Sequence, residues 1–349
     1  MTLDRDRYRR VLVQAPNWLG DFAMATPVFR CIRESLPDAR LTVLMRSYLK
    51  RVHDGAPWFD EVMTYDARGA DRGAFGFLRK VRALRRERFD LSIVLTNSFR
   101  SAWLARASGA RQRLGYDLQG RAFLLTHTLR PEMATKTKRV PKPMPLYYFD
   151  LLESFGFERG DDRMELFIPP ETEAAGAKLL DSFGIRAGER LVALNPGASF
   201  GASKLWNPES FAAVGDALTR EGARVLVLYG PGEEELAASI RSKMQESPVD
   251  DGGTMVSLDL LKPVLRRCSL LVTTDAGPRH VAVAVGCPVV CVMGPTDPRY
   301  SATNLERSVV LREDVDCAPC HLKTCPIDHR CMERLRPERV LEACRRLLR

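Results

Sequence analysis

The 349-residue sequence contains no run of about 18 apolar residues, the length that a membrane-spanning helix needs. Its N-terminus, MTLDRDRYRR, leads directly into a predicted strand and lacks the apolar core of a signal peptide. We therefore expect a cytosolic protein without a transmembrane anchor.

The turn after the first predicted strand contains a single glycine, Gly20. A dinucleotide-binding fingerprint needs three glycines at fixed spacing, and a P-loop needs a Lys-Ser/Thr pair, and this turn has neither. The sequence also contains no recognisable DNA- or RNA-binding motif. The first turn is therefore neither a dinucleotide-binding fingerprint nor a P-loop. Nucleic acid is not an expected partner.

Nine cysteines in a chain of this length, without a signal peptide, do not indicate a secreted disulfide framework. Four of them gather near the C-terminus with two histidines: Cys317, Cys320, His321, Cys325, His329 and Cys331. One C-x-x-C pair followed by single cysteines is a weaker zinc signal than two such pairs. Reduced or packed thiols are the favoured interpretation, no metal site is assigned, and structural zinc remains the alternative.

The formal charge is +9, and much of the excess lies in two segments, Leu78–Arg88 and Arg130–Lys142. The first has a helical pattern, so a solvated helix face is its simplest explanation. The second lies in a proline-containing stretch without helical or strand period. A loop that meets a large anionic partner, such as a membrane surface or an acidic substrate, fits it better.

The length of the chain exceeds that of one ordinary domain, and strand and helix patterns alternate twice along it. Strand–helix–strand order predicts right-handed parallel crossovers, so the fold class is α/β with two similar domains. The predicted domains are 1–165 and 166–336, followed by a helix at 337–349 with one buried side.

The densest signals lie in Ser269–Tyr300. A short apolar strand ends at Asp275, Gly277-Pro278 begins a helix, and a second buried strand follows at Val289–Met293. A helix N-terminus at the carboxyl end of a parallel strand suits an anion such as a diphosphate. The simpler alternative is that Asp275 only caps the helix and His280 only packs.

Other strand ends also carry polar side chains. Asp21 follows the first turn, where it could be a general base or merely a helix cap. Ser199 and Lys204 follow a strand in the second half and suit phosphate oxygens. Glu233 ends the next strand, where it could accept from ribose hydroxyls or face a helix dipole.

Five segments together resemble the ADP-heptose:lipopolysaccharide heptosyltransferases, inverting glycosyltransferases of the GT-B fold. They are NWLGD (17–21), NPGAS with SKLWN (195–207), GPGEEE (230–235), TTDAGPRHVAVAVGCPVVCVMGPTDP (273–298) and CAPCHLKTCPIDHRCM (317–332). The resemblance covers nearly the whole chain. Within the family, NWLGD and the cysteine-bearing tail are most similar to the type that adds the second heptose of the inner core.

The resemblance implies two Rossmann-like domains across a cleft, the first for the acceptor and the second for the nucleotide sugar, with the C-terminal helix packed back on the first. It implies that Asp21 is the catalytic base, which would face the donor motif across that cleft. Lys204 matches a residue that meets the diphosphate, and Glu233 matches one near the ribose. The expected donor-binding residues are Ser199, Lys204, Glu233, Thr274, Asp275, Ala276, Gly277 and His280.

The resemblance also implies the substrates. The donor would be ADP-heptose, the acceptor a lipid A-Kdo-heptose, and no cofactor or bound metal would be required. The basic segments would hold the protein at the cytoplasmic leaflet of the inner membrane by electrostatic attraction rather than insertion. The alternatives are a related glycosyltransferase with another donor or acceptor, including a heptosyltransferase I type, and a nucleotide-sugar-binding protein without turnover.

Overall fold

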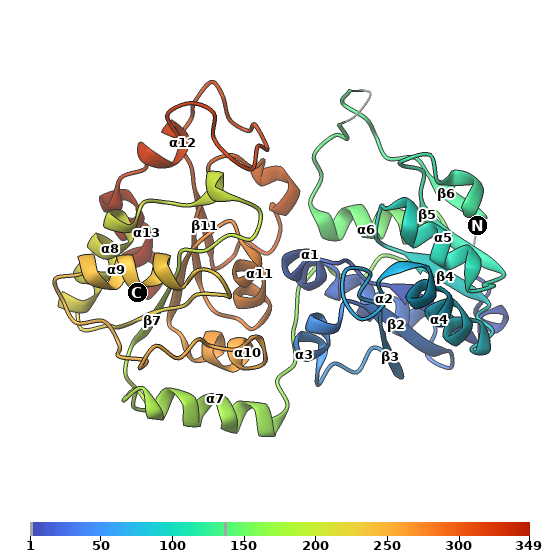
Figure 1. Cartoon of the computed structure of the whole chain (residues 1–349), viewed down its shortest axis with the longest axis horizontal. Helices are drawn as coiled ribbons and strands as arrows, with labels where there is room; N and C mark the ends of the chain where they lie inside the picture. Colours follow the sequence, from blue (N-terminus) through green and yellow to red (C-terminus); the bar gives the residue numbers. More distant parts are fainter. Residues whose placement is uncertain (1–2, 136–137) are drawn as a thin grey trace. The chain divides into compact units, whose positions relative to one another are not determined.

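The computed structural model describes residues 3–135 and 138–349 and divides into two compact units (Figure 1). The first unit ends at Met164, and the second runs from Glu165 to Arg349. Each unit is an α/β domain with its own sheet, as the alternating sequence pattern predicts.

The first unit contains a six-stranded parallel sheet in the order β3-β2-β1-β4-β5-β6. Its strands are β1 (Arg10–Gln14), β2 (Arg40–Met45), β3 (Glu61–Thr64), β4 (Leu91–Val94), β5 (Gln112–Tyr116) and β6 (His127–Leu129). The chain builds the sheet outward from β1 in one direction and then resumes at β4 on the other side. The strand order therefore reverses between β1 and β4, where open parallel sheets commonly bind ligands.

The helices of the first unit connect these strands. They are α1 (Leu19–Met24), α2 (Thr26–Ser35), α3 (Lys50–His53), α4 (Gly73–Arg86), α5 (Phe99–Ala107) and α6 (Met144–Glu153), with short 3-10 helices η1 (Arg5–Arg7), η2 (Ser47–Leu49) and η3 (Ala122–Leu124). Helices α2 and α6 pack against each other, and so do α4 and α5. Val81 and Leu84 of α4 are buried with Phe89 and Leu104, so α4 has one core face.

The second unit contains a five-stranded parallel sheet in the order β11-β10-β9-β7-β8. Its strands are β7 (Leu191–Asn195), β8 (Arg224–Val227), β9 (Leu270–Thr274), β10 (Val289–Val292) and β11 (Ser308–Leu311). Strands β7 and β9 are wholly buried, as the continuous apolar runs predict. The order reverses between these two strands.

The helices of the second unit lie in two groups. They are α7 (Pro170–Ser182), α8 (Pro208–Arg220), α9 (Glu234–Lys243), α10 (Leu258–Arg267), α11 (Gly277–Ala284), α12 (Arg330–Glu333) and α13 (Pro337–Leu348), with η4 (Ala202–Lys204) and η5 (Pro298–Ser301). Helices α9, α8 and α13 pack in succession, while α10 contacts both α7 and α11 (Figure 1). Right-handed crossovers place such groups on opposite faces of the sheet.

The C-terminal helix corrects one expectation. Helix α13 does not complete the first domain: it packs on α8, β9 and β10 of the second unit. Val340, Ala343 and Cys344 are buried in the core there, and Arg345 pairs with Glu221 beside the end of α8 at 2.5 Å. The apolar side of α13 thus packs into the core of its own unit.

The basic segment Arg130–Lys142 follows β6 and has no helix or strand in its described part, as the sequence predicts. Positions 136 and 137 of this segment lie outside the described residues. Met133 and Arg139 form an isolated antiparallel bridge, and the Arg139 guanidinium lies 3.9 Å from the centre of the Tyr147 ring. Among the described residues, no helix combines the length and apolarity needed to cross a bilayer.

Candidate donor site

The predicted donor residues of the second unit lie around the carboxyl ends of β7 and β9. These strands are neighbours, with Asn195 opposite Thr273, and the Asn195 amide donates to the Thr273 hydroxyl at 3.1 Å. The loop after β7 leads to Lys204, and the loop after β9 carries Asp275. The strand order of this sheet reverses here, so the site occupies the position where doubly wound sheets bind ligands.

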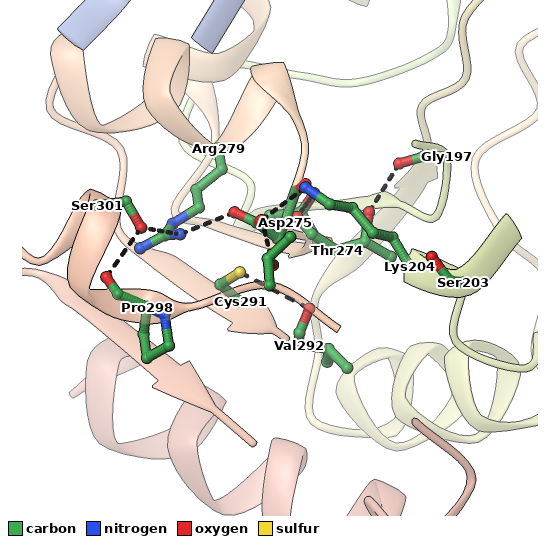
Figure 2. A network of polar contacts seen from close by, with 12 residues as sticks. Gly197, Ser203, Lys204, Thr274, Asp275, Arg279, Cys291, Val292, Pro298 and Ser301 are labelled. Carbon is green, nitrogen blue, oxygen red and sulfur yellow. Dashed lines mark hydrogen bonds and ion pairs between the residues drawn. The ribbon is translucent and has the colours of Figure 1, made fainter. Parts of the chain in front are cut away.

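The carboxylate of Asp275 is the centre of a polar network (Figure 2). The Lys204 ammonium donates to Asp275 Oδ2 at 2.6 Å and to its backbone oxygen at 2.7 Å. The Arg279 guanidinium donates to Oδ1 at 3.1 Å, and the Thr296 hydroxyl donates to Oδ2 at 2.7 Å. Two loops and one helix therefore supply partners to the carboxylate of Asp275, which lies in a third loop.

Burial disfavours the ionised form of Asp275, but the charges of Lys204 and Arg279 outweigh it and hold the pKa of this carboxyl well below its usual range. The ionised triad carries two positive charges and one negative charge. Its side chains are at most 14% exposed, so water screens them little. A net positive charge in such a site favours an anionic ligand.

Helix capping does not explain Asp275. The N-cap residue of α11 is Ala276, which has an extended backbone, and Asp275 precedes it. Pro278 has no N–H group, and the N–H groups of Ala276 and Arg279 already donate to the carbonyl oxygens of Thr274 and Ala276. The side chains of Lys204 and Arg279 therefore supply more of the positive potential than the helix terminus that the sequence emphasises.

His280 is 7% exposed on α11. Burial and, to a lesser degree, the neighbouring positive charge of Arg279 lower its pKa to about 3, while Asp275 opposes the shift. The imidazole is therefore neutral at physiological pH. It adds a polar group near the triad without adding charge.

Glu233 joins two further loops. It occupies the N-cap position of α9, but its carboxylate accepts from the Gly230 N–H at 2.8 Å instead of capping the helix. A Cβ atom added to Gly197 would lie 1.9 Å from Glu233 Oε2, so a larger residue here would displace the end of the Glu233 side chain. Thr274 donates to the Gly197 carbonyl at 2.7 Å, and Ser199 is exposed on the same loop. The loop after β7 thus contacts both Glu233, at the end of the loop after β8, and Thr274, at the end of β9.

Asp21 lies in the first unit, in the first turn of α1. The N-cap residue of α1 is Trp18, so Asp21 is not the cap. Two tyrosines near Asp21 have a raised pKa: that of Tyr48 is raised to about 12, and that of Tyr148 is also raised. Burial is the main cause in both, and the negative charge of Asp21 adds to it. Asp21 is half-buried and shares its surroundings with two tyrosine side chains.

The sequence does not identify every member of the network. Thr296 lies in the loop after β10 and donates to Asp275, and Ser301 lies 3.0 Å from Arg279 Nη1. The loop GPTDP follows a buried strand, which is a signal that could have directed attention to Thr296. Nothing in the pattern around Ser301 indicates its contact with Arg279.

The cysteines near the C-terminus show no ready metal site. Within the described ranges, no group of three or more histidine, cysteine or acidic side chains is placed to hold a metal ion. Cys331 is buried in the core of the second unit, and Cys317 packs against that core. Burial raises the pKa of Cys331, and the nearby thiols of Cys317, Cys320 and Cys325 raise it further. The thiols are therefore neighbours, and at least Cys331 has a packing role.

The two parallel α/β units have the GT-B fold, which is the fold that the sequence predicts. The structure is similar to that of a family 9 glycosyl transferase from Veillonella parvula, with a TM-score of 0.87, 24% identity, and coverage of 100% of this chain and 98% of the other. It is also similar to the Escherichia coli ADP-heptose lps heptosyltransferase II, with a TM-score of 0.76, 22% identity, and coverage of 97% and 98%.

Residues 77–330 match the sequence model of "Glycosyltransferase family 9 (heptosyltransferase)", and the chain belongs to this family. The enzyme is thus a heptosyltransferase of family 9, which confirms the sequence-based assignment. A curated relative, lipooligosaccharide heptosyltransferase 2 of Campylobacter jejuni, is 27% identical over 347 residues, which are 97% of this chain and 98% of the relative.

Proposed function

We propose that this enzyme moves L-glycero-D-manno-heptose from ADP-heptose to a heptose on the inner core of lipopolysaccharide, with inversion at the anomeric carbon. Similarity to the Campylobacter jejuni and Escherichia coli heptosyltransferases described above supports the substrate class. The observation that carries the proposal is the Lys204–Asp275–Arg279 triad, because its net positive charge suits a sugar diphosphate.

We assign donor binding to the second unit. Lys204 and Arg279 would attract the diphosphate oxygens, and Asp275 would hold both cations in place until the donor arrives. The Glu233 carboxylate, on the neighbouring loop, would accept from ribose hydroxyl groups, and the exposed Ser199 would donate to a phosphate oxygen. Thr274, Ala276, Gly277 and His280 complete the proposed donor set on β9 and α11.

We assign the role of general base to Asp21. The acceptor hydroxyl oxygen would form a bond to the anomeric carbon while the bond from that carbon to the diphosphate oxygen breaks. Asp21 would take the hydroxyl proton, and ADP would leave with the bonding electron pair. Positioned base catalysis is worth about 10²- to 10⁴-fold, and the charges of Lys204 and Arg279 would stabilise the leaving group.

We propose that the side chains of Lys204 and Arg279 replace a metal ion at the diphosphate, so that no cofactor is needed. A chelator such as EDTA should then leave turnover of the purified enzyme unchanged. Loss of turnover with EDTA, restored by added magnesium or manganese, would contradict this part of the proposal.

We assign acceptor binding to the first unit. Three basic residues of the segment Arg130–Lys142, which are Arg130, Arg139 and Lys142, line a cavity of about 560 Å³. Its lining also includes Tyr116, Tyr147 and the acidic residues Glu132, Asp150 and Glu153. Arginine, lysine and aromatic side chains suit an acidic sugar, and the acceptor proposed here is anionic. The same basic segment would be attracted to the anionic cytoplasmic leaflet of the inner membrane, and that attraction should weaken with salt.

The test incubates the enzyme with each of several nucleotide-sugar donors and a heptose-truncated lipopolysaccharide acceptor. Release of ADP, UDP or GDP is measured. The proposal predicts acceptor-dependent ADP release from ADP-heptose and a product one heptose larger by mass. Preferential UDP or GDP release would indicate a related glycosyltransferase with another donor. Tight ADP-heptose binding without product would indicate a binding protein without turnover.

A further inference from the structure

The first unit exposes a group of large apolar side chains on α4, α5 and η3. These side chains, which we call the aromatic surface, are Phe75, Leu78, Phe99, Trp103 and Phe123. Their exposed fractions lie between 43% for Phe99 and 78% for Phe75. Single exposed apolar residues are common in proteins, but a contiguous group usually marks an interaction site.

Ring contacts and helix spacings relate the elements that carry the aromatic surface. The Trp103 ring lies 4.7 Å from the ring of Phe77, which joins α5 to α4, and the Phe99 ring lies 6.0 Å from that of Phe123. Phe75 and Leu78 are three residues apart on α4, and Phe99 and Trp103 are four apart on α5. Such spacings place each pair on one side of its helix.

The opposite sides of these elements account for their stability. Val81 and Leu84 of α4 and Leu104 of α5 belong to one buried cluster, while Ala102 of α5 and Leu124 of η3 belong to another. The core therefore holds the three elements without help from the exposed rings. The aromatic surface is available for a partner.

Basic side chains accompany the aromatic surface, and no acidic residue occurs in any of its three elements. The basic residues are Arg79, Lys80, Arg82, Arg85 and Arg86 in α4, and Arg100 and Arg106 in α5. Arg85 donates to the Ala107 carbonyl at 2.7 Å, which links α4 to α5, and Arg100 donates to the hydroxyl of Tyr65, which follows β3, at 3.3 Å. Exposed rings among cations are the composition of a surface that lies in a membrane interface.

We propose that α4, α5 and η3 dock on a bilayer of anionic lipids and insert the aromatic surface into its headgroup region. This inference rests on the proposed function in one respect, since a lipid-linked acceptor gives the enzyme a reason to reach the bilayer. Arginine and lysine side chains attract anionic headgroups, and the rings bury apolar area below them. Electrostatic attraction alone, which the sequence suggests, leaves the exposed rings without a role.

A second copy of the chain fits this surface less well. In a two-fold dimer the same patch meets itself, so the arginines of α4 and α5 would face one another without compensating acids in these elements. Like charges brought together in that way oppose association. An anionic lipid surface supplies the missing negative charge.

The test uses the full chain and vesicles of phosphatidylcholine with phosphatidylglycerol, in which no acceptor is present. The double variant Phe75→Ser/Phe123→Ser removes the two most exposed rings, and Leu305→Ser, at a 42% exposed residue of the second unit, is the matched control. We expect vesicle affinity to fall about tenfold or more in the double variant and to stay unchanged in the control. Thermal unfolding should be the same in all three proteins.

Vesicle binding at high salt distinguishes insertion of the aromatic surface from electrostatic attraction alone. At about 1 M salt the Debye length is about 3 Å, so charge attraction is nearly screened. The wild-type protein should keep measurable binding to these vesicles, and the double variant should lose it. Lipids brominated in the acyl chain should quench wild-type fluorescence more than that of Trp103→Phe, because Trp103 would lie in the interface.

Three results would overturn the proposal: equal vesicle affinity of wild type and double variant, no wild-type binding at high salt, or a dimer that the double variant disrupts. Because the vesicles contain no acceptor, vesicle binding without heptose transfer would contradict the proposed function and leave the docking surface standing. Heptose transfer to a detergent-dispersed acceptor without vesicle binding would support the proposed function and contradict the docking surface.

Discussion

Replacing Asp275 with asparagine isolates the electrostatic role of the triad. The substitution keeps the size of the side chain and removes its negative charge. The Lys204 and Arg279 side chains, which are 12% and 2% exposed, then remain nearly buried without their shared carboxylate. We expect the free energy of unfolding of the second unit to fall.

The size of this fall follows from the burial of the two cations. Removing one partner of a buried ion pair costs about 3–5 kcal/mol, mostly because the other charge stays buried. Arg279 also contacts the Ser301 hydroxyl at 3.0 Å, which offsets part of the loss, so we take the lower end, about 3 kcal/mol. For a domain of this size the melting temperature should fall by about 6–12 °C.

The difference in the free energy of unfolding between wild type and Asp275→Asn should also depend on pH. The pKa of Asp275 is depressed in the folded protein, whereas an unfolded aspartate titrates near pH ~3.9. The stability contributed by its charge is therefore fully present above about pH 5 and is lost as the pH falls below about 4. The gap between wild type and Asp275→Asn should close over that acidic range.

Urea denaturation at several pH values measures this gap, and hydrogen exchange in α11 and β7 assigns the transition to the second unit. Glu221→Gln is a matched control, because Glu221 pairs with Arg345 at the surface, where an ion pair contributes about 0–1 kcal/mol. If Asp275→Asn is within about 0.5 kcal/mol of wild type at pH 7, the reasoning about buried charge is refuted.

Three further predictions concern the same site. The pKa of His280 is about 3 when folded and about 6.5 when unfolded, so wild-type stability should fall as the pH drops below about 6.5, by up to about 1.4 kcal/mol per pH unit. His280→Asn should reduce the loss between pH 7 and pH 5 in urea denaturation, and an unchanged loss would contradict this. Gly197→Ala should lower the free energy of unfolding by about 1 kcal/mol, because the added Cβ displaces the Glu233 carboxylate from the Gly230 N–H, and the cost should vanish in a Glu233→Ala background; additive costs in calorimetry would contradict the contact. Lys204→Ala should raise the Kd for ADP-heptose at least about tenfold in titration calorimetry, and an unchanged Kd would remove Lys204 from the donor site.

The sequence predicts the strands of both sheets well where they are buried on both faces. The short apolar runs Leu191–Leu194 and Leu270–Thr273 are each followed by turn residues, and they form the central strands Leu191–Asn195 and Leu270–Thr274. The edge strand Ser308–Leu311 is only partly buried and short, so its pattern carries little information. The expected packing of the C-terminal helix on the first domain is wrong because an amphipathic pattern shows that one side is buried but not against what.

The sequence indicates which residues of the candidate donor site lie together, but it does not give their contacts. The strand ends at Asn195 and Thr274 indicate one edge of the sheet, because parallel strands end together. The pairing of Lys204 with Asp275 spans 71 residues of sequence, and no local pattern encodes it. Side-chain partners such as Thr296 depend on how separate loops meet, and only the folded chain shows that.

The measurement that tests the central claim most directly is ADP release from ADP-heptose with a heptose-truncated lipopolysaccharide acceptor, for wild type and Asp21→Asn side by side. We predict acceptor-dependent ADP release by the wild type, and turnover lower by about 10²- to 10⁴-fold in the variant with nearly unchanged donor affinity. Absence of ADP release by the folded wild type would contradict heptosyl transfer to this acceptor, and near-normal turnover of Asp21→Asn would contradict the role of Asp21.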